Sequence, residues 1–150
     1  MIETEVHLGH SFKKLHCLLA QTTDRRLQEL DLTSAQGHVI GYLTHTTEPP
    51  CARDLELAFG LTHATVSGIL SRMEGKGFIA LQPDPQDRRV KRIFLLDKGA
   101  ACSREIGEHI RETERSITAG FSPEELTAFR GFLSRAIQNL SETNQSDREE

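Results

Sequence analysis

The chain has 150 residues, which suits one domain, or one small domain with appended helices, able to bury a core without disulfides or metals. Its formal net charge of −4 excludes a protein coated with cations, such as a histone-like or ribosomal protein, although a local basic patch can still contact phosphates. The three cysteines, Cys17, Cys51 and Cys102, form no CxxC pair, so neither a disulfide framework nor a zinc knuckle is predicted.

The N-terminal segment "MIETEVHLGHSFKK" has two early glutamates and no long apolar run, unlike a signal peptide. No stretch approaches the roughly 18 uninterrupted apolar residues that a membrane helix needs. Together with the unpaired cysteines, this predicts a soluble cytoplasmic protein without a membrane partner.

Two helices are predicted in the first third of the chain. Apolar residues recur at helical spacing over residues 6–30, with no Pro or Gly after Gly9. These residues are Leu8, Phe12, Leu15, Leu19, Leu27 and Leu30. A second helix follows Thr33, because this threonine can cap it and Gln36 can complete a capping box. We expect this helix to end near His45, before two consecutive prolines.

A short helix, a tight turn and another helix come next. "CARDLELAFG" predicts the short helix, closed by Gly60 in a left-handed conformation. In "LTHATVSGILSRMEGKGF", Thr62 is the expected N-cap, and Gly75 and Gly77 end the helix. One buried stripe is predicted for each: Ala52, Leu55 and Ala58 in the short helix, and Val66, Ile69, Leu70 and Met73 in the next.

The remaining segments predict a β-hairpin and two further helices. "FIALQ" and "VKRIFLL" are strand-like runs separated by the turn-forming "PDPQDRR". Asp97 can cap a helix over residues 98–118. Ser122, Pro123 and Glu125 are the expected cap, first-turn proline and capping-box partner of a last helix through about Leu140. The polar tail, residues 141–150, is predicted to be disordered.

The order of elements over residues 33–97 is that of a winged helix-turn-helix, in which the second helix enters the DNA major groove and the hairpin is the wing. The predicted fold class is therefore mainly α with a small β-hairpin wing, in one domain with helical extensions at both ends. The extensions cover residues 6–30 and 98–140.

The second helix of the helix-turn-helix is the one capped by Thr62. Its outward face consists mainly of small residues: Ala64, Gly68, Ser71 and Gly75, flanked by Ser67 and Arg72. A merely exposed helix face usually carries Glu, Lys and Gln. Glycine at position 68 costs about 1 kcal/mol of helix propensity relative to alanine. Glycine is favourable where the helix backbone must lie close to a DNA groove, because it has no side chain to hold the two apart.

Several side chains of this helix are candidates for DNA contacts. His63, Thr65, Ser67 and Ser71 can donate to phosphates or base edges, and Arg72 can contact guanine or phosphate. The alternative is that Thr62 and Thr65 only cap the helix and that Arg72 is a solvated charge. A wing that follows directly favours the DNA interpretation.

Four cations fall within five positions after the hairpin turn: Arg88, Arg89, Lys91 and Arg92. In a wing, such guanidinium groups lie beside the duplex and bind phosphates or enter a narrow minor groove, and Asp87 is close enough to hold one arginine through a bidentate pair. Ordinary solvated surface is the alternative interpretation.

Four segments in this order closely resemble the MarR family of bacterial transcriptional regulators, over roughly Phe12 to Leu140. They are "LTSAQGHVIGYL", "DLELAFGLTHATVSGILSRMEGKGFI", "DPQDRRVKRIFLLDKGA" and "FSPEELTAFRGFL". The most specific part is a helix, "GKGFI", then D-x-x-D-R-R leading to L-D-K-G.

The resemblance implies a homodimer whose N- and C-terminal helices interlock while two winged lobes bind double-stranded DNA at a palindromic operator. It also implies that Asp87 orients Arg89 at the minor groove and that the segment 62–72, including His63 and Ala64, contacts the major groove. Position 68, often arginine or another polar residue in relatives, is glycine here, which puts direct base readout at that position in question.

The resemblance leaves the signal open. Family members commonly release DNA when an aromatic acid or phenolic molecule binds between the dimerisation helices and the wing domain, but one Tyr and no Trp give this chain no distinctive phenol-binding set. A hydroperoxide-sensing branch uses a first-helix cysteine. Cys17 lies in a different context, without the activating tyrosines, and is interpreted as a small buried hydrophobe.

A zinc-sensing branch of the family uses histidines near the positions of His38 and His109. Here Gly37 stands where that branch has an acidic ligand, so the chain does not offer the set of about four ligands that tetrahedral zinc needs. We therefore expect no metal and no cofactor. The sequence contains no glycine-rich phosphate loop, no GxSxG and no HExxH, so no motif predicts an enzyme. A winged-helix protein-interaction module is the remaining rival, but it would tolerate Asp or Ser at Arg88 and Arg89 and would place apolar residues outward on the second helix. The sequence favours a DNA-binding regulator, most simply a repressor.

Overall fold

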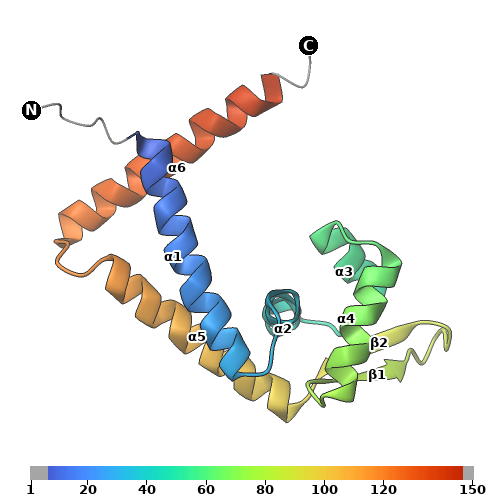
Figure 1. Cartoon of the computed structure of the whole chain (residues 1–150). Coiled ribbons are helices and arrows are strands. Elements are labelled where there is room, and N and C mark those ends of the chain that lie inside the picture. The colour runs from blue at the N-terminus through green and yellow to red at the C-terminus, as the bar shows by residue number, and fades with distance from the viewer. Residues whose placement is uncertain (1–6, 147–150) are drawn as a thin grey trace, which may run out of the picture. The chain divides into compact units, whose positions relative to one another are not determined.

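A computed structural model describes residues 7–146 of the chain. In chain order the elements are α1 (Leu8–Glu29), α2 (Ser34–His45), α3 (Ala52–Phe59), α4 (His63–Gly75), β1 (Ile79–Pro83), β2 (Lys91–Leu95), α5 (Asp97–Ile117) and α6 (Pro123–Ser146) (Figure 1). The described residues form two compact units, one ending at Arg111 and one beginning at Glu112, so α5 contributes to both. The predicted fold class, mainly α with one β-hairpin, is confirmed.

The hydrophobic core of the first unit lies among α2, α3, α4 and the hairpin. All four residues predicted for the buried stripe of α4 are in it, together with the fully buried Phe78 that follows this helix. The buried set is Leu27, Leu32, Val39, Ile40, Leu43, Leu55, Val66, Ile69, Leu70, Met73, Phe78, Ile79, Ile93 and Cys102. Burying one large apolar side chain stabilises a fold by about 1.5–3 kcal/mol, so this stripe sets the rotation of α4 about its own axis.

Local capping signals fix the helix boundaries much as the sequence predicts. The Thr33 hydroxyl accepts from the backbone N–H of Gln36 at 3.3 Å, and the Gln36 side chain accepts from the Thr33 N–H at 3.0 Å. Gly60 has φ of 63° and ends α3, a conformation that L-residues with side chains rarely adopt. The Thr62 hydroxyl accepts from the N–H of Thr65 at 3.3 Å and so caps α4.

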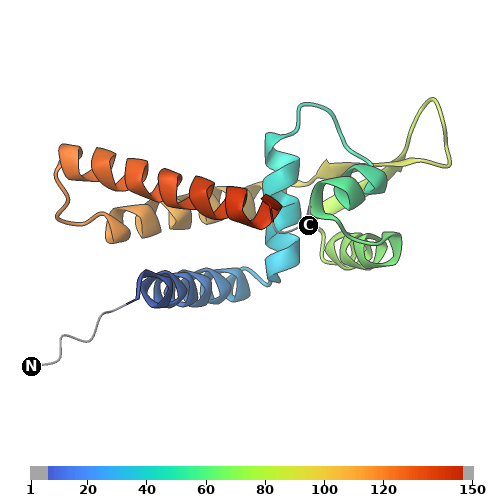
Figure 2. The same cartoon turned by 90° about the horizontal axis from the view of Figure 1, so that it is seen from above.

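The hairpin pairs its strands antiparallel and is fastened to the start of α3. Ile79 pairs with Leu95 and Pro83 with Lys91. The backbone N–H of Ile93 donates to the carbonyl of Pro50 at 2.8 Å. Figure 2 shows the turn between β1 and β2 projecting away from the helices of this lobe. The turn therefore extends from a base that is anchored on both sides.

Two details of the predicted boundaries differ from the structure. The fifth helix begins at Asp97 itself, and α6 continues to Ser146, through part of the segment predicted to be disordered. A local contact supports the longer helix: Gln138 Nε2 donates to Glu142 Oε1 at 2.9 Å, an i, i+4 pair of the kind that stabilises a helix. The rest of that predicted tail, 147–150, lies outside the described residues. The Ser122–Glu125 capping box is present.

Both terminal helices expose large apolar side chains within the single chain. In α1 the N-terminal half of the predicted apolar stripe is open, and Leu8 is 74% exposed, whereas Leu27 is buried. In α6 three large apolar residues are each 60% exposed or more. The exposed set is Leu8, Phe12, Leu15 and Leu18 in α1, Ile110 in α5, and Phe132, Ile137 and Leu140 in α6. None of the helices among the described residues is both long and apolar enough to cross a membrane.

The close contact at the start of α5 gives a stability test. A Cβ atom at Gly99 would lie 2.6 Å from Leu95 Cδ1 and would collide with the backbone oxygen of Phe78. We expect Gly99→Ala to lower the free energy of unfolding by about 1–3 kcal/mol, measured by urea denaturation. Gly107→Ala on the same helix is the matched control, because its Cβ would make only an ordinary contact with Arg111, 3.6 Å away. Equal stability of both variants would contradict this account of Gly99.

Candidate nucleic-acid interface

The face of α4 opposite its buried stripe is open to solvent. Ala64, Ser67 and Ser71 are exposed on this face, and Arg72 is exposed beside it. Burial of the stripe from Val66 to Met73 turns these residues outward, as the helical period requires. The outward face predicted from the sequence is therefore confirmed as a surface of small and hydroxyl-bearing residues.

Gly68 has space around it in the structure. A Cβ atom there would meet only the guanidinium nitrogens of Arg72, at 3.8 and 3.9 Å, which is ordinary van der Waals contact. The fold of the chain therefore does not require glycine at this position. Glycine at position 68 lowers the stability of the helix, and no packing contact within the chain compensates for this.

The two threonines at the start of α4 are engaged in capping. Thr62 caps the N–H of Thr65, and the hydroxyl oxygens of Thr62 and Thr65 lie 2.9 Å apart. Both residues remain exposed. Thr62 is the N-cap of α4, as predicted, and the Thr65 hydroxyl contacts that of Thr62.

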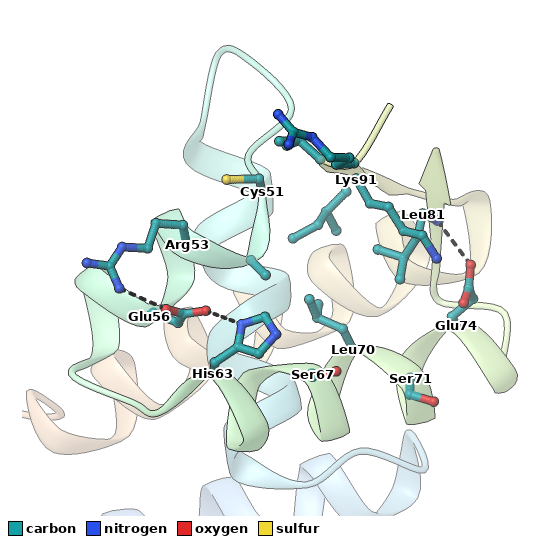
Figure 3. Close-up of a pocket in the computed structure, with 14 residues that line it drawn as sticks. Cys51, Arg53, Glu56, His63, Ser67, Leu70, Ser71, Glu74, Leu81 and Lys91 are labelled. Atoms are coloured by element: carbon teal, nitrogen blue, oxygen red, sulfur yellow. Dashed lines mark hydrogen bonds and ion pairs between the residues drawn. The ribbon is translucent and has the colours of Figure 1, made fainter. Parts of the chain in front are cut away.

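A carboxylate that the sequence did not single out contacts the first residue of α4. Glu56 Oε1 lies 2.6 Å from His63 Nδ1, and Glu56 Oε2 accepts from Arg53 Nη1 at 3.0 Å (Figure 3). Hydrogen bonds from His63 and then from Arg53 hold the pKa of Glu56 below its usual range. No helical pattern in the sequence indicates the pairing of Glu56 with His63, because these two residues belong to different helices.

The tip of the wing carries the predicted Asp87–Arg89 pair. Arg89 donates from Nε to Oδ1 and from Nη2 to Oδ2 of Asp87, both at 3.1 Å, which is a bidentate geometry. The hydrogen bond from Arg89 is the main reason that the pKa of Asp87 is lowered. The Arg89 side chain is 90% exposed, so its guanidinium is oriented and still open to solvent. Arg88 and Lys91 are exposed as well.

The fourth cation of the run, Arg92, has a structural role instead. Its Nε donates to Asp84 Oδ2 at 2.6 Å and its Nη1 donates to the carbonyl of Pro49 at 3.3 Å. Asp84 is buried and also accepts from the backbone of Gln86 at 2.7 Å and of Asp87 at 3.3 Å. The hydrogen bond from Arg92 lowers the pKa of Asp84 and the same bond raises that of Arg92. This network shapes the turn that presents Asp87 and Arg89.

A cavity of about 660 Å³ separates α3 and α4 from the wing. Glu56 and His63 lie on its helical side, with Ser67 and Ser71 farther along α4, and Lys91 comes from the wing (Figure 3). Arg89 also belongs to its lining. The helical side of the hollow thus carries hydroxyls, an imidazole and the carboxylates of Glu56 and Glu74, and the wing side carries the cations Arg89 and Lys91. The hydroxyls, the imidazole and the cations are groups that can contact phosphate.

The candidate sensor residues are scattered. His38 is exposed on α2, whereas His109 on α5 has a buried Nε2 without a hydrogen-bond partner in the described part of the chain. Within residues 7–146, no three His, Cys, Asp or Glu side chains are grouped to hold a metal ion. The interpretation of Cys17 as a buried hydrophobe is wrong for the single chain, because it lies on the open part of α1. Cys102 is buried, and burial raises the pKa of its thiol.

Comparisons with known proteins agree on one family. A family model described as MarR family matches residues 30–90. A Clostridium acetobutylicum structure described as a MarR family transcriptional regulator is 31% identical, over 87% of this chain and 96% of that one, with a TM-score of 0.73. MepR, a regulator of the Staphylococcus aureus multidrug efflux pump MepA, is 28% identical over 89% and 98% of the chains, with a TM-score of 0.79. A MepR–DNA complex is 29% identical over 86% and 96%, with a TM-score of 0.74.

Proposed function

The chain belongs to the MarR family of transcriptional regulators, and from this premise we propose that it is a homodimeric repressor of a palindromic DNA operator. A small-molecule signal would release it from the DNA. The relative MepR has been solved bound to DNA, which supports DNA as the partner of this chain. The observation that carries the proposal is the pairing of an outward α4 face of small residues with a wing whose exposed cations lie across one cavity.

The two elements would contact different parts of the duplex. In a winged helix-turn-helix, the second helix enters the major groove, so α4 supplies the base contacts. Its proposed contact residues are Thr62, His63, Ala64, Thr65, Ser67, Gly68, Ser71 and Arg72. The wing would bind the phosphate backbone or the neighbouring minor groove through Arg88, Arg89 and Lys91, with Asp87 orienting Arg89.

The cavity between α4 and the wing would receive the sugar-phosphate strand that separates the two grooves. Ser67 and Ser71 can donate to phosphate oxygens from one side, and Arg89 and Lys91 can do so from the other. Arg89 is pre-oriented by Asp87, so less side-chain entropy is lost when it binds. This arrangement favours a nucleic acid over a flat protein partner, since the outward face of α4 has no large apolar residue.

The homodimer is supported by the exposed side chains of the terminal helices. Leu8, Phe12 and Leu15 leave an apolar stripe of α1 open, and Phe132, Ile137 and Leu140 do the same for α6. Exposed apolar groups on this scale are typical of an interface. A second copy is the occupant that the family resemblance implies, and a two-fold dimer matches a palindromic operator with half-sites about one helical turn apart.

The proposed release signal is a small molecule. An aromatic or phenolic effector is the expected class by family resemblance. The alternatives are a redox signal through Cys17 and zinc through His38 and His109. Cys17 is exposed in the single chain, His38 lies exposed on α2, and His109 has its Nε2 buried on α5. No feature of α4 supports a winged-helix protein-interaction module, because the outward face of this helix has no large apolar residue.

The first experiment is selection of bound sequences from a random double-stranded DNA pool, with the mass of the protein in solution measured on the same preparation. We expect an enriched inverted repeat and a dimer mass, because two identical lobes would contact two half-sites. The enriched sequence then serves as the probe for aromatic acids, peroxide and zinc as releasing signals. A monomer, or a pool without enrichment, would contradict the proposal.

Arg89→Ala tests the wing. Loss of one oriented guanidinium should weaken operator binding about tenfold and lower the slope of log affinity against log salt concentration by about 1. The measurement is fluorescence anisotropy over a salt series. Arg104→Ala, which removes an exposed arginine of α5, is the matched control and should leave both quantities unchanged. An Arg89→Ala variant with wild-type affinity and slope would show that the wing does not contact phosphates.

Gly68→Ala separates stability from DNA binding. The substitution should raise the free energy of unfolding by about 1 kcal/mol, because alanine favours the helix and the site has space. Operator affinity should nevertheless fall, because a Cβ would stand between α4 and the groove floor. Gly41→Ala in α2, where a Cβ would also meet nothing within 4 Å, should stabilise without changing affinity. Undiminished affinity of Gly68→Ala would mean that the helix backbone does not approach the groove closely.

A further inference from the structure

The contact between Glu56 and His63 joins a buried acid to an exposed base at the edge of α4. The Glu56 side chain is only 9% exposed, whereas that of His63 is 77% exposed. The second carboxylate oxygen is taken by Arg53, itself largely exposed. In Figure 3 Glu56 lies between Arg53 and His63, and the imidazole of His63 lies nearer to Ser67 than Glu56 does. The carboxylate is thus a fixed support, and the imidazole is the part that a ligand can meet.

This support determines which ring nitrogen is free. An ionised carboxylate only accepts hydrogen bonds, so the nitrogen 2.6 Å from it, Nδ1, must carry the proton. The lowered pKa of Glu56 keeps the group ionised near neutral pH. Nε2 therefore remains for an external partner. It is a hydrogen-bond acceptor in the neutral ring and a donor when the ring is protonated.

The position of His63 makes this nitrogen relevant to sequence recognition. His63 is the first residue of α4, and N-terminal residues of a recognition helix contact base edges in the major groove. A protonated Nε2 can donate to guanine O6 or N7, or to a phosphate oxygen. A ring held at Nδ1 pays less orientational entropy on binding than a free imidazole does.

We propose that Glu56 is a positioning residue that holds the imidazole of His63 with Nε2 available to the DNA, and that His63 is a specificity-determining contact of the recognition helix. This inference rests on the proposed function. The held ring would meet the same base pair in each half-site, because Glu56 fixes its orientation.

Other charged groups surround the same cavity. Arg53 and Glu56 face it from α3, Glu74 from α4, Arg89 and Lys91 from the wing, and Cys51 from the residue before α3. Glu56 is the group in hydrogen-bond contact with His63, while Glu74 accepts from the backbone N–H of Leu81 at 3.2 Å. Glu74 therefore offers a matched control: it is a carboxylate of the same cavity that does not touch the imidazole.

The test measures, at one pH, the affinity of the full-length protein for the operator taken from the random-pool selection and for random DNA. Glu56→Gln keeps the shape of the side chain but removes its charge, and His63→Gln removes the imidazole. Both should weaken operator binding about tenfold and leave binding to random DNA within about twofold, because an oriented base contact is lost. Glu74→Gln should keep the wild-type affinity for both.

Two further measurements distinguish positioning from a merely structural role. Selection repeated with Glu56→Gln and His63→Gln should relax the preference at the same base pair in each half-site. Imidazole nitrogen spectra of the free wild-type protein should show the neutral ring protonated on Nδ1. Thermal unfolding of the variants checks that the fold is retained.

The outcomes separate the two proposals. If the wild type enriches a sequence but Glu56→Gln keeps its operator affinity and base preference, the proposed function stands and the inference about Glu56 is wrong. The same holds if the neutral ring of free His63 carries its proton on Nε2, or if Glu56→Gln weakens operator and random DNA equally. If the wild type enriches no sequence at all, the proposed function fails and the inference fails with it.

Discussion

The burial of one stripe of α4 is the constraint on which the rest of the lobe depends. Met73 and Val66 lie at or below 2% exposure, and they pack in one core with Leu55 of α3 and Ile93 of β2. A helix fixed on one side has its opposite side fixed as well, because the helical period leaves no freedom of rotation. The open face of small residues is therefore a consequence of hydrophobic packing.

The wing depends on the same core but needs a second device to hold its charges. Strand β2 is fastened by Ile93 to the backbone of Pro50, and Arg92 links the turn to this segment through Asp84. One cation of the basic run is thus used to build the wing, which leaves the others for a partner. Arg89 is steered by Asp87 without being covered by it. Such preorganisation spares part of the entropy that a flexible arginine would lose on binding.

The apolar faces of α1 and α6 make the single chain incomplete in energetic terms. Side chains such as Leu8 and Phe132 gain nothing from folding alone, and their burial would require a second surface. If that surface is a second copy, the stability of the protein and its ability to bind DNA both depend on protein concentration. Cys17 on α1 is likewise exposed in the single chain.

The sequence by itself determined what depends on neighbouring residues: the capping pairs at Thr33 and Ser122, the left-handed turn at Gly60, the period of the α4 stripe and the charged turn of the hairpin. The Asp87–Arg89 pair could be predicted as well, because its two residues are close in the sequence. Only the tertiary structure decided that Glu56 supports His63, that Arg92 braces the wing, and that Gly99 passes against Phe78. These contacts join separate elements, and no local pattern encodes a distance that depends on how the core packs.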